Sequence, residues 1–148
     1  GKGWVEANGE PCKKTSYATL IEMENCTLPD LNRRTLSASV SSVWNSGQRE
    51  GKAIVNSTEN FISEARRIHE GVLKITFKAN FFEEKPHVTA SPNILDGRTI
   101  TVANVTKDGF EVEVNKVDEH GNKKKDTDFY VFVRGKTKLK AYIKAQDN

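Results

Sequence analysis

Hydrophobic and polar residues alternate along several short stretches of this chain, most clearly within residues 71–114. In the first of these stretches Leu73, Ile75 and Phe77 share one side, and polar residues occupy the other. Residues 110–114 repeat the same spacing. Because successive side chains of a β-strand point to opposite faces of the sheet, each stretch predicts a strand with one buried and one solvent-facing side.

Turn signals separate these apolar stretches. Asp96-Gly97 and Asp108-Gly109 lie where the alternation breaks, and Asp-Gly pairs are typical of tight turns between antiparallel strands. Residues 52–148 hold about seven or eight apolar stretches, which is typical of a β-sandwich. We therefore predict a mainly β fold with an antiparallel β-sandwich over residues 52–148. The basic run Arg134–Lys144 is expected to supply its final strand.

One late strand carries apolar side chains on both faces. Phe129, Val131 and Val133 alternate there with Tyr130 and Phe132. A strand that is apolar on both faces usually lies in the centre of a sheet or in a subunit interface. We therefore expect Tyr130 and Phe132 to lie in a contact between subunits, where a second copy would cover the apolar surface.

The N-terminal part, residues 1–36, has a different character. A short strand is predicted at Trp4–Ala7, and a turn follows it. Apolar residues at helical spacing predict one short helix over about Ser16–Met23, whose first free amide Thr15 or Ser16 can cap. The helix must end before Pro29, because proline restricts its predecessor to extended backbone. The prediction is a small α+β module that precedes the sandwich.

Serine is frequent between the two predicted parts. Residues 37–51 have the composition of a linker or exposed loop. The predicted organisation is therefore a module at residues 1–36, a Ser-rich linker at 37–51 and a sandwich at 52–148.

The chain has two cysteines, Cys12 and Cys26. A disulfide between them would close a short loop and stabilise the fold by about 3 kcal/mol. Two reduced thiols are the alternative, and the sequence leaves both open. With no further cysteine and with three widely separated histidines, we expect no metal site and no cofactor.

The charge is nearly balanced. The 23 basic and 20 acidic residues give a formal net charge of +3. Nucleic-acid and membrane-surface binders usually concentrate basic residues, and no apolar run approaches the roughly 18 residues of a membrane span. We therefore expect neither nucleic-acid binding nor membrane insertion.

Motifs in the first part resemble a known module. Gly3-Trp4, Asn8-Gly9, Ser16–Leu20 and Leu28–Arg34 follow one another in the order found in the tail-collar module of bacteriophage tail fibres. That family combines a Gly-Trp pair, a turn, a Tyr-x-x-Leu helix and a Leu-Pro-Asp-Leu loop. The resemblance implies a collar-like module at the N-terminal end.

The second part is similar to phage tail-fibre tips and to H-type lectins. The resemblance lies in Ile54–Asn56, Gly71–Phe77, Phe82–Val88, Asn104–Phe110 and Phe129–Gly135. Taken together, the two resemblances imply a viral receptor-binding protein: a homotrimer in the tail fibre of an extracellular virion, or in a phage-derived tail particle. It would serve host attachment by adhesion to a bacterial surface polysaccharide, through carbohydrate binding, or to an outer-membrane protein.

A basic loop between strands is the candidate for receptor contact. A cluster of cations on a loop can bind acidic bacterial surface polymers, although a solvated hairpin tip has the same composition. The residues assigned to this contact are His120, Asn122, Lys123, Lys124 and Lys125.

No catalytic set is recognisable. The acidic pairs Glu83-Glu84 and Asp118-Glu119 are sequence neighbours, whereas glycosidases need two carboxylates facing each other across a cleft. We therefore expect a non-enzymatic protein. Two alternatives stay open: a carbohydrate-binding lectin of the H-type kind, and a small polysaccharide hydrolase.

Overall fold

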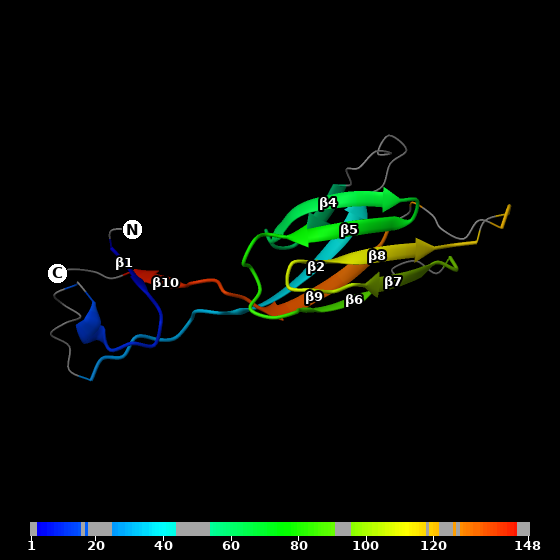
Figure 1. The fold of residues 1–148 in the computed structure, drawn as a ribbon. Helices are drawn as coiled ribbons and strands as arrows, with labels where there is room; N and C mark the ends of the chain where they lie inside the picture. Colours follow the sequence, from blue (N-terminus) through cyan, green and yellow to red (C-terminus); the bar gives the residue numbers. More distant parts are fainter. Residues whose placement is uncertain are drawn as a thin grey trace. The chain divides into compact units, whose positions relative to one another are not determined.

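The computed structural model describes residues 3–15, 17, 25–43, 54–90, 96–117, 119–121, 126 and 128–144 (Figure 1). Along the chain the elements are β1 (Trp4–Glu6), the 3₁₀ helix η1 (Cys12–Lys14), β2 (Thr35–Val43), β3 (Ile54–Ser57), β4 (Ile62–His69), β5 (Val72–Phe77), β6 (His87–Ala90), β7 (Thr99–Ala103), β8 (Gly109–Asn115), β9 (Tyr130–Lys136) and β10 (Tyr142–Lys144). They fall into two compact units, which we call the terminal unit (Gly1–Arg34 and Lys138–Asn148) and the sandwich unit (Thr35–Thr137).

The sandwich unit is built from two four-stranded sheets with the strand orders β3-β2-β9-β6 and β4-β5-β8-β7. All of the described pairings within them are antiparallel. The mainly β fold and the antiparallel sandwich that the alternation predicts are therefore confirmed. The Asp96-Gly97 turn precedes β7, and the Asp108-Gly109 turn joins β7 to β8, so the two turns flank opposite ends of one strand.

The core lies between the inner faces of these two sheets. Each sheet contributes the apolar half of its alternating strands, as the spacing predicts for β5 and β8. The buried residues are Leu36, Ala38, Val40, Phe61, Leu73, Ile75, Phe77, Phe81, Phe82, Phe110, Val112, Val114, Phe129, Val131 and Val133. Five of the phenylalanines make ring contacts with one another, at centroid distances between 4.9 and 6.2 Å.

Strand β9 is an interior strand of its sheet. It pairs with β2 along one edge and with β6 along the other, so its backbone donors and acceptors are used on both sides. Of the two alternatives that its two apolar faces left open, the central position is the one that these pairings show, and the subunit contact stays a prediction. Val131 and Val133 face the core, and Tyr130 and Phe132 therefore point to the outside of the sandwich.

The predicted Ser-rich linker is wrong for residues 37–43. These residues belong to β2, which pairs with both β9 and β3. Leu36, Ala38 and Val40 are buried and alternate with serines on the outer face, so the period-2 pattern was present but overshadowed by the serine content. The other part of that linker, residues 44–51, lies outside the described residues.

The C-terminal residues do not complete the sandwich, which corrects the predicted boundary at residue 148. Strand β10 pairs with β1 in the terminal unit, with Val5 opposite Ile143. The loop that resembles the collar family contributes here, because the Oδ1 atom of Asn32 accepts a 2.7 Å hydrogen bond from the Ala141 amide. The physical reason is pairing: an isolated β1 needs a second strand to satisfy its backbone, and residues 142–144 provide it.

Cys12 and Cys26 form a disulfide in the terminal unit. It joins η1 to the segment before Leu28, and Val5, Cys12 and Leu28 form a small buried cluster beside it. The predicted helix over Ser16–Met23 lies outside the described residues except for Tyr17, whose hydroxyl accepts a 2.6 Å hydrogen bond from the Gly3 amide.

Candidate receptor-binding face

Strand register decides which side chains share the outer face of the β3-β2-β9-β6 sheet. Residues directly opposite each other in an antiparallel pair lie on the same face, and every second residue of a strand joins them. We call this surface the β9 face. Its described members are Thr35, Ser37, Ser39, Ser41, Asn56, His87, Thr89, Tyr130, Phe132, Arg134 and Lys136.

Two aromatic rings stand at the centre of the β9 face. The rings of Tyr130 and Phe132 meet edge to face, with centroids 5.1 Å apart and planes at 79°. Phe132 keeps 48% of its surface exposed although it lies on an interior strand, whereas Tyr130 is partly buried. Exposed aromatic surface at a rigid position is the kind of surface that binding sites use, because ordering it costs little side-chain entropy.

Small hydroxyl side chains flank both rings. Ser41 lies opposite Tyr130, and Ser39 and Thr89 lie on either side of Phe132 on the neighbouring strands. A hydroxyl can both donate and accept a hydrogen bond, so this surface offers polar partners around two apolar rings. Because serine and threonine are short, they leave about half of Phe132 exposed, at 48%.

The charge on the β9 face has one sign. Arg134 lies opposite His87, and Lys136 follows on the same side of β9. Among the described positions of this face, none carries a carboxylate. Acidic residues adjoin the face at both ends: Asp128 precedes β9 at the Tyr130 end, and at the other end the Glu83 amide donates a 2.9 Å hydrogen bond to the Lys136 carbonyl oxygen.

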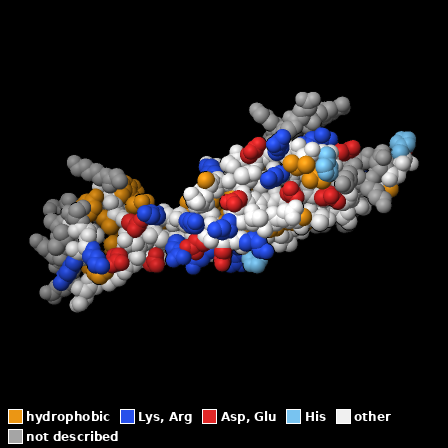
Figure 2. Space-filling model, in the orientation of Figure 1, with side chains coloured by type: hydrophobic (Ala, Val, Ile, Leu, Met, Phe, Trp, Pro, Cys, Tyr) orange, Lys and Arg blue, Asp and Glu red, His pale blue; other side chains and the backbone are white. Residues whose placement is uncertain are grey.

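The outer face of the other sheet has a different chemistry. Lys74 of β5 lies opposite Glu111 of β8 and Arg66 of β4, and Glu113 lies opposite Thr101. Figure 2 shows Lys or Arg and Asp or Glu side chains interspersed over the sandwich unit. Mixed charges of this kind make a solvated surface, so the two outer faces of one sandwich are chemically distinct.

The predicted receptor loop is described only in part. His120 lies exposed in a turn after β8, whereas Asn122, Lys123, Lys124 and Lys125 lie outside the described residues. The assignment of these residues to receptor contact stays a prediction.

Two arginines anchor the chain after this loop. The Arg67 guanidinium donates to both carboxylate oxygens of Asp126 at 2.9 to 3.2 Å, and the Gly71 amide donates to the same carboxylate at 2.9 Å. Arg98 donates to the Asp128 carbonyl oxygen at 2.6 Å. The chain that enters β9 is thereby held against the β4-β5 hairpin and the start of β7.

Asp96 holds the side chain of Arg98, which makes the second of these two contacts. Its carboxylate accepts hydrogen bonds from the Arg98 guanidinium, the shortest at 2.7 Å, and from the Lys116 ammonium at 3.1 Å. The Arg98 hydrogen bond is the main cause that lowers the pKa of Asp96 well below its ordinary value, and the Lys116 bond acts in the same direction. The anchor therefore depends on an ionised Asp96.

Among the described residues the three histidines lie apart from one another, and the one contact with an acidic pair is His120 Nε2 with its sequence neighbour Glu119 at 3.6 Å. His69 lies on β4, His87 on β6 and His120 in a turn. Within the described residues no group of three His, Cys, Asp or Glu side chains is placed to hold a metal ion. Glu83 and Glu84 follow the buried Phe82, and Asp118 lies outside the described residues.

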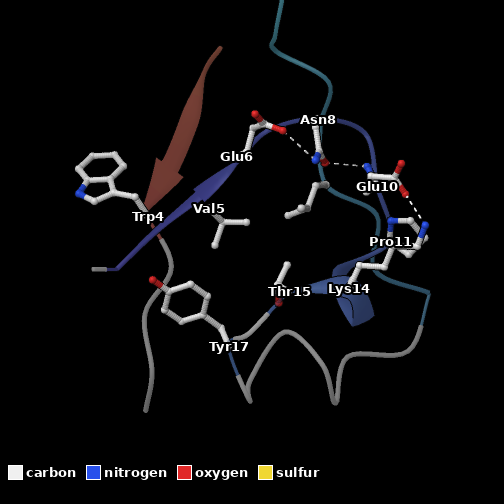
Figure 3. A pocket seen from close by; sticks show the side chains of 10 residues that line it. Trp4, Val5, Glu6, Asn8, Glu10, Pro11, Lys14, Thr15 and Tyr17 are labelled. Carbon is white, nitrogen blue, oxygen red and sulfur yellow. Dashed lines mark hydrogen bonds and ion pairs between the residues drawn. The ribbon is translucent and has the colours of Figure 1, made fainter. Parts of the chain in front are cut away.

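The terminal unit contains a cavity of about 400 Å³ (Figure 3). Figure 3 shows Trp4 and Tyr17 toward one side of it and Glu6, Asn8 and Glu10 toward the other. The polar side is largely paired with itself or its neighbours: Glu10 with Lys14 at 3.0 Å, and Glu6 with Asn8 at 3.0 Å and with Lys140 at 3.4 Å. Glu6, Asn8 and Glu10 therefore already have partners, whereas the Oγ1 atom of Thr15, which also lines the cavity, is buried without one among the described residues.

A comparison with protein families, curated proteins and solved structures finds no match. In the part of the chain that the structure describes, no helix has the length and apolar character needed to cross a membrane.

Sequence reasoning found part of this face and missed the rest. It identified Tyr130 and Phe132, because these residues are apolar at positions where an alternating strand would carry polar side chains. It missed the serines of β2, since it assigned them to a linker. The alternation of Leu36, Ala38 and Val40 with serine was the signal that could have placed them. Only the register of β2 against β9 puts the serines beside the two rings.

Proposed function

We propose that this chain is a non-enzymatic receptor-binding module of the bacteriophage tail-fibre kind, which attaches as a homotrimer to a receptor on a bacterial surface. The observation that carries the proposal is the ring pair of the exposed Phe132 and the partly buried Tyr130, set among hydroxyl side chains on an interior strand. An interior strand is a rigid support, and binding sites on rigid elements are positioned more accurately than sites on loops.

The order of motifs supports the tail-fibre assignment. The Leu28–Arg34 loop, which resembles the collar family, helps to hold the C-terminal segment through the bond from the Ala141 amide to Asn32. The strands of the sandwich unit follow the order of motifs that resembles fibre tips. In this proposal the terminal unit joins the module to the fibre, and the sandwich unit meets the receptor.

A trimer would strengthen attachment. Linked copies of a weak site act at a high effective concentration, so three faces can hold a repetitive bacterial surface although each binds weakly. The sequence-based assignment of Tyr130 and Phe132 to the trimer contact remains a prediction, because the structure contains a single chain. We favour receptor contact for this pair, for the reasons of charge and shape given below.

Binding to cells tests the proposal directly. The labelled protein is added to a panel of bacterial strains before and after periodate treatment, which destroys polysaccharide, and before and after protease treatment. We expect saturable binding to some strains, and light scattering at micromolar protein should give the mass of three chains. A monomer that binds no strain in a broad panel would contradict the proposal.

A lectin of the H-type kind is the second candidate, and the same rings and hydroxyls favour it. A monosaccharide hit on a glycan array, together with binding to no bacterial strain, would favour the lectin over the fibre module.

A further inference from the structure

We propose that the β9 face binds an acidic polysaccharide of the bacterial surface, laid along strand β9. This inference rests on the proposed function and names the receptor class for it. The rings of Tyr130 and Phe132 would pack against sugar rings, and Arg134 and Lys136 would bind the carboxylates of the polymer.

The shape of the site fits a polymer. Alternate residues of a strand lie about 6.7 Å apart, so Tyr130, Phe132, Arg134 and Lys136 form a stripe of about 20 Å. An elongated stripe on an open face can contact several units of a chain, whereas a single sugar is usually enclosed in a concave pocket. The stripe has its rings at one end and its cations at the other.

Charge selects an acidic ligand. Arg134 and Lys136 are the charged residues among the paired strand positions of this face besides His87, and the neighbouring carboxylates, Glu83 and Asp128, lie at its two ends beyond those positions. A guanidinium binds a carboxylate with two parallel hydrogen bonds, so the contact is directional as well as strong. The neighbouring hydroxyls of Ser39 and Thr89 are placed to exchange hydrogen bonds with sugar hydroxyls.

A second copy of the same face is a poorer occupant. In a two-fold contact with the two β9 strands parallel, the cations at Arg134 and Lys136 would meet each other without any carboxylate from these strands to pair with. Single-stranded nucleic acid fits the rings poorly, because successive bases need stacking faces that are roughly parallel. The ring planes of Tyr130 and Phe132 are instead nearly perpendicular, at 79°.

The test uses polygalacturonate, a polymer of acidic sugars, with its methyl ester as the uncharged control. Binding of the full chain is measured by affinity electrophoresis and calorimetry at low salt and at physiological salt. We expect binding to polygalacturonate only, weakening as salt screens the charges. Phe132→Ala and Arg134→Ala should each reduce the affinity at least about tenfold. Lys74→Ala removes an exposed cation from the outer face of the other sheet and should leave the affinity for polygalacturonate unchanged.

Each other outcome counts against the inference in a distinguishable way. Binding to bacterial cells without binding to polygalacturonate overturns the acidic ligand and leaves the proposed function standing. Binding to neither overturns both. Equal loss of affinity in Lys74→Ala shows non-specific charge attraction, and tighter binding to oligothymidine than to polygalacturonate shows a nucleic-acid site. Light scattering that shows Phe132→Ala has become monomeric, with unchanged affinity per chain, assigns the rings to the trimer contact instead. Thermal melting of each variant confirms that it is folded.

Discussion

Arg67 on β4 and Asp126, 59 positions later in the chain, form a two-pronged ion pair in which the guanidinium meets both carboxylate oxygens. The same carboxylate accepts a bond from the Gly71 amide at the tip of the β4-β5 hairpin. Asp126 therefore closes the hairpin and fixes the approach to β9 at one point. The two side chains are only about one-fifth exposed or less, at 22% and 16%.

Removing this pair should destabilise the sandwich unit. Asp126→Ala removes the carboxylate that pairs with Arg67 and accepts from the Gly71 amide, and we expect a loss of about 1–2 kcal/mol in the free energy of unfolding, since partial exposure screens the pair. Asp126→Asn can still accept from Gly71 and should cost less. Urea denaturation measures both. Lys14→Ala, which breaks the exposed Glu10–Lys14 pair, serves as control and should change stability by under about 0.5 kcal/mol. Equal effects of the two Asp126 variants would show that the Gly71 bond adds nothing.

Asp96 makes part of the stability depend on pH. Its pKa is lowered in the folded chain, mainly by the Arg98 hydrogen bond, while its ordinary value is 3.8. Below pH 3.8 the Asp96 carboxylate takes up a proton in the unfolded chain but not in the folded chain. The stability that Asp96 contributes is therefore complete above this pH and declines as the pH falls below it. The melting-temperature gap between the natural chain and Asp96→Asn should be widest near neutral pH and should narrow in acid. Thermal melts at neutral pH and below about pH 3 measure this gap in melting temperature. A gap of the same size at both pH values would contradict the dependence of stability on the ionisation of Asp96.

Gly109 has no room for a side chain. A Cβ atom there would collide with the Ile75 carbonyl oxygen, which the β5-β8 pairing holds in place. Gly109→Ala should therefore destabilise the fold by about 1–3 kcal/mol in urea denaturation. Gly97→Ala is the matched control, because a Cβ there meets nothing within 4 Å and only the positive φ of +84° opposes it. Its cost should be about 1–2 kcal/mol. A Gly109→Ala variant as stable as the natural chain would show that β5 can move aside.

The disulfide should stabilise the terminal unit alone. Cys12 and Cys26 are 14 positions apart, and closing a loop of that size is worth about 3 kcal/mol in the chain-entropy description. Replacing both with serine should speed hydrogen exchange of the Ala7 amide, which is bonded to the Ala141 carbonyl at 2.8 Å. Amides of β5 and β8 in the sandwich unit should keep their protection. Loss of protection in both units together would show that they unfold as one.

The sandwich core was largely predictable from sequence, and the outer faces were not. Alternation placed Leu73, Ile75 and Phe77 on a buried side, and burial depends on a local period that any reader of the chain can count. The linker error at β2 arose because serine content suggests a loop, while the buried half of the same strand was sparse in large residues. The β1-β10 pairing was missed for another reason: local patterns carry no information about which distant strand becomes a partner.

The amino-acid sequence by itself determined that this chain folds into antiparallel strands with an apolar core, because the period of its side chains admits few other structures. It also marked Tyr130 and Phe132 as unusual. Only the tertiary structure decided what surrounds those rings. Strand register set the serines of β2 and Thr89 beside them and His87 opposite Arg134. Register follows from the packing of two whole sheets over one core, which is a property of the folded chain rather than of any single stretch.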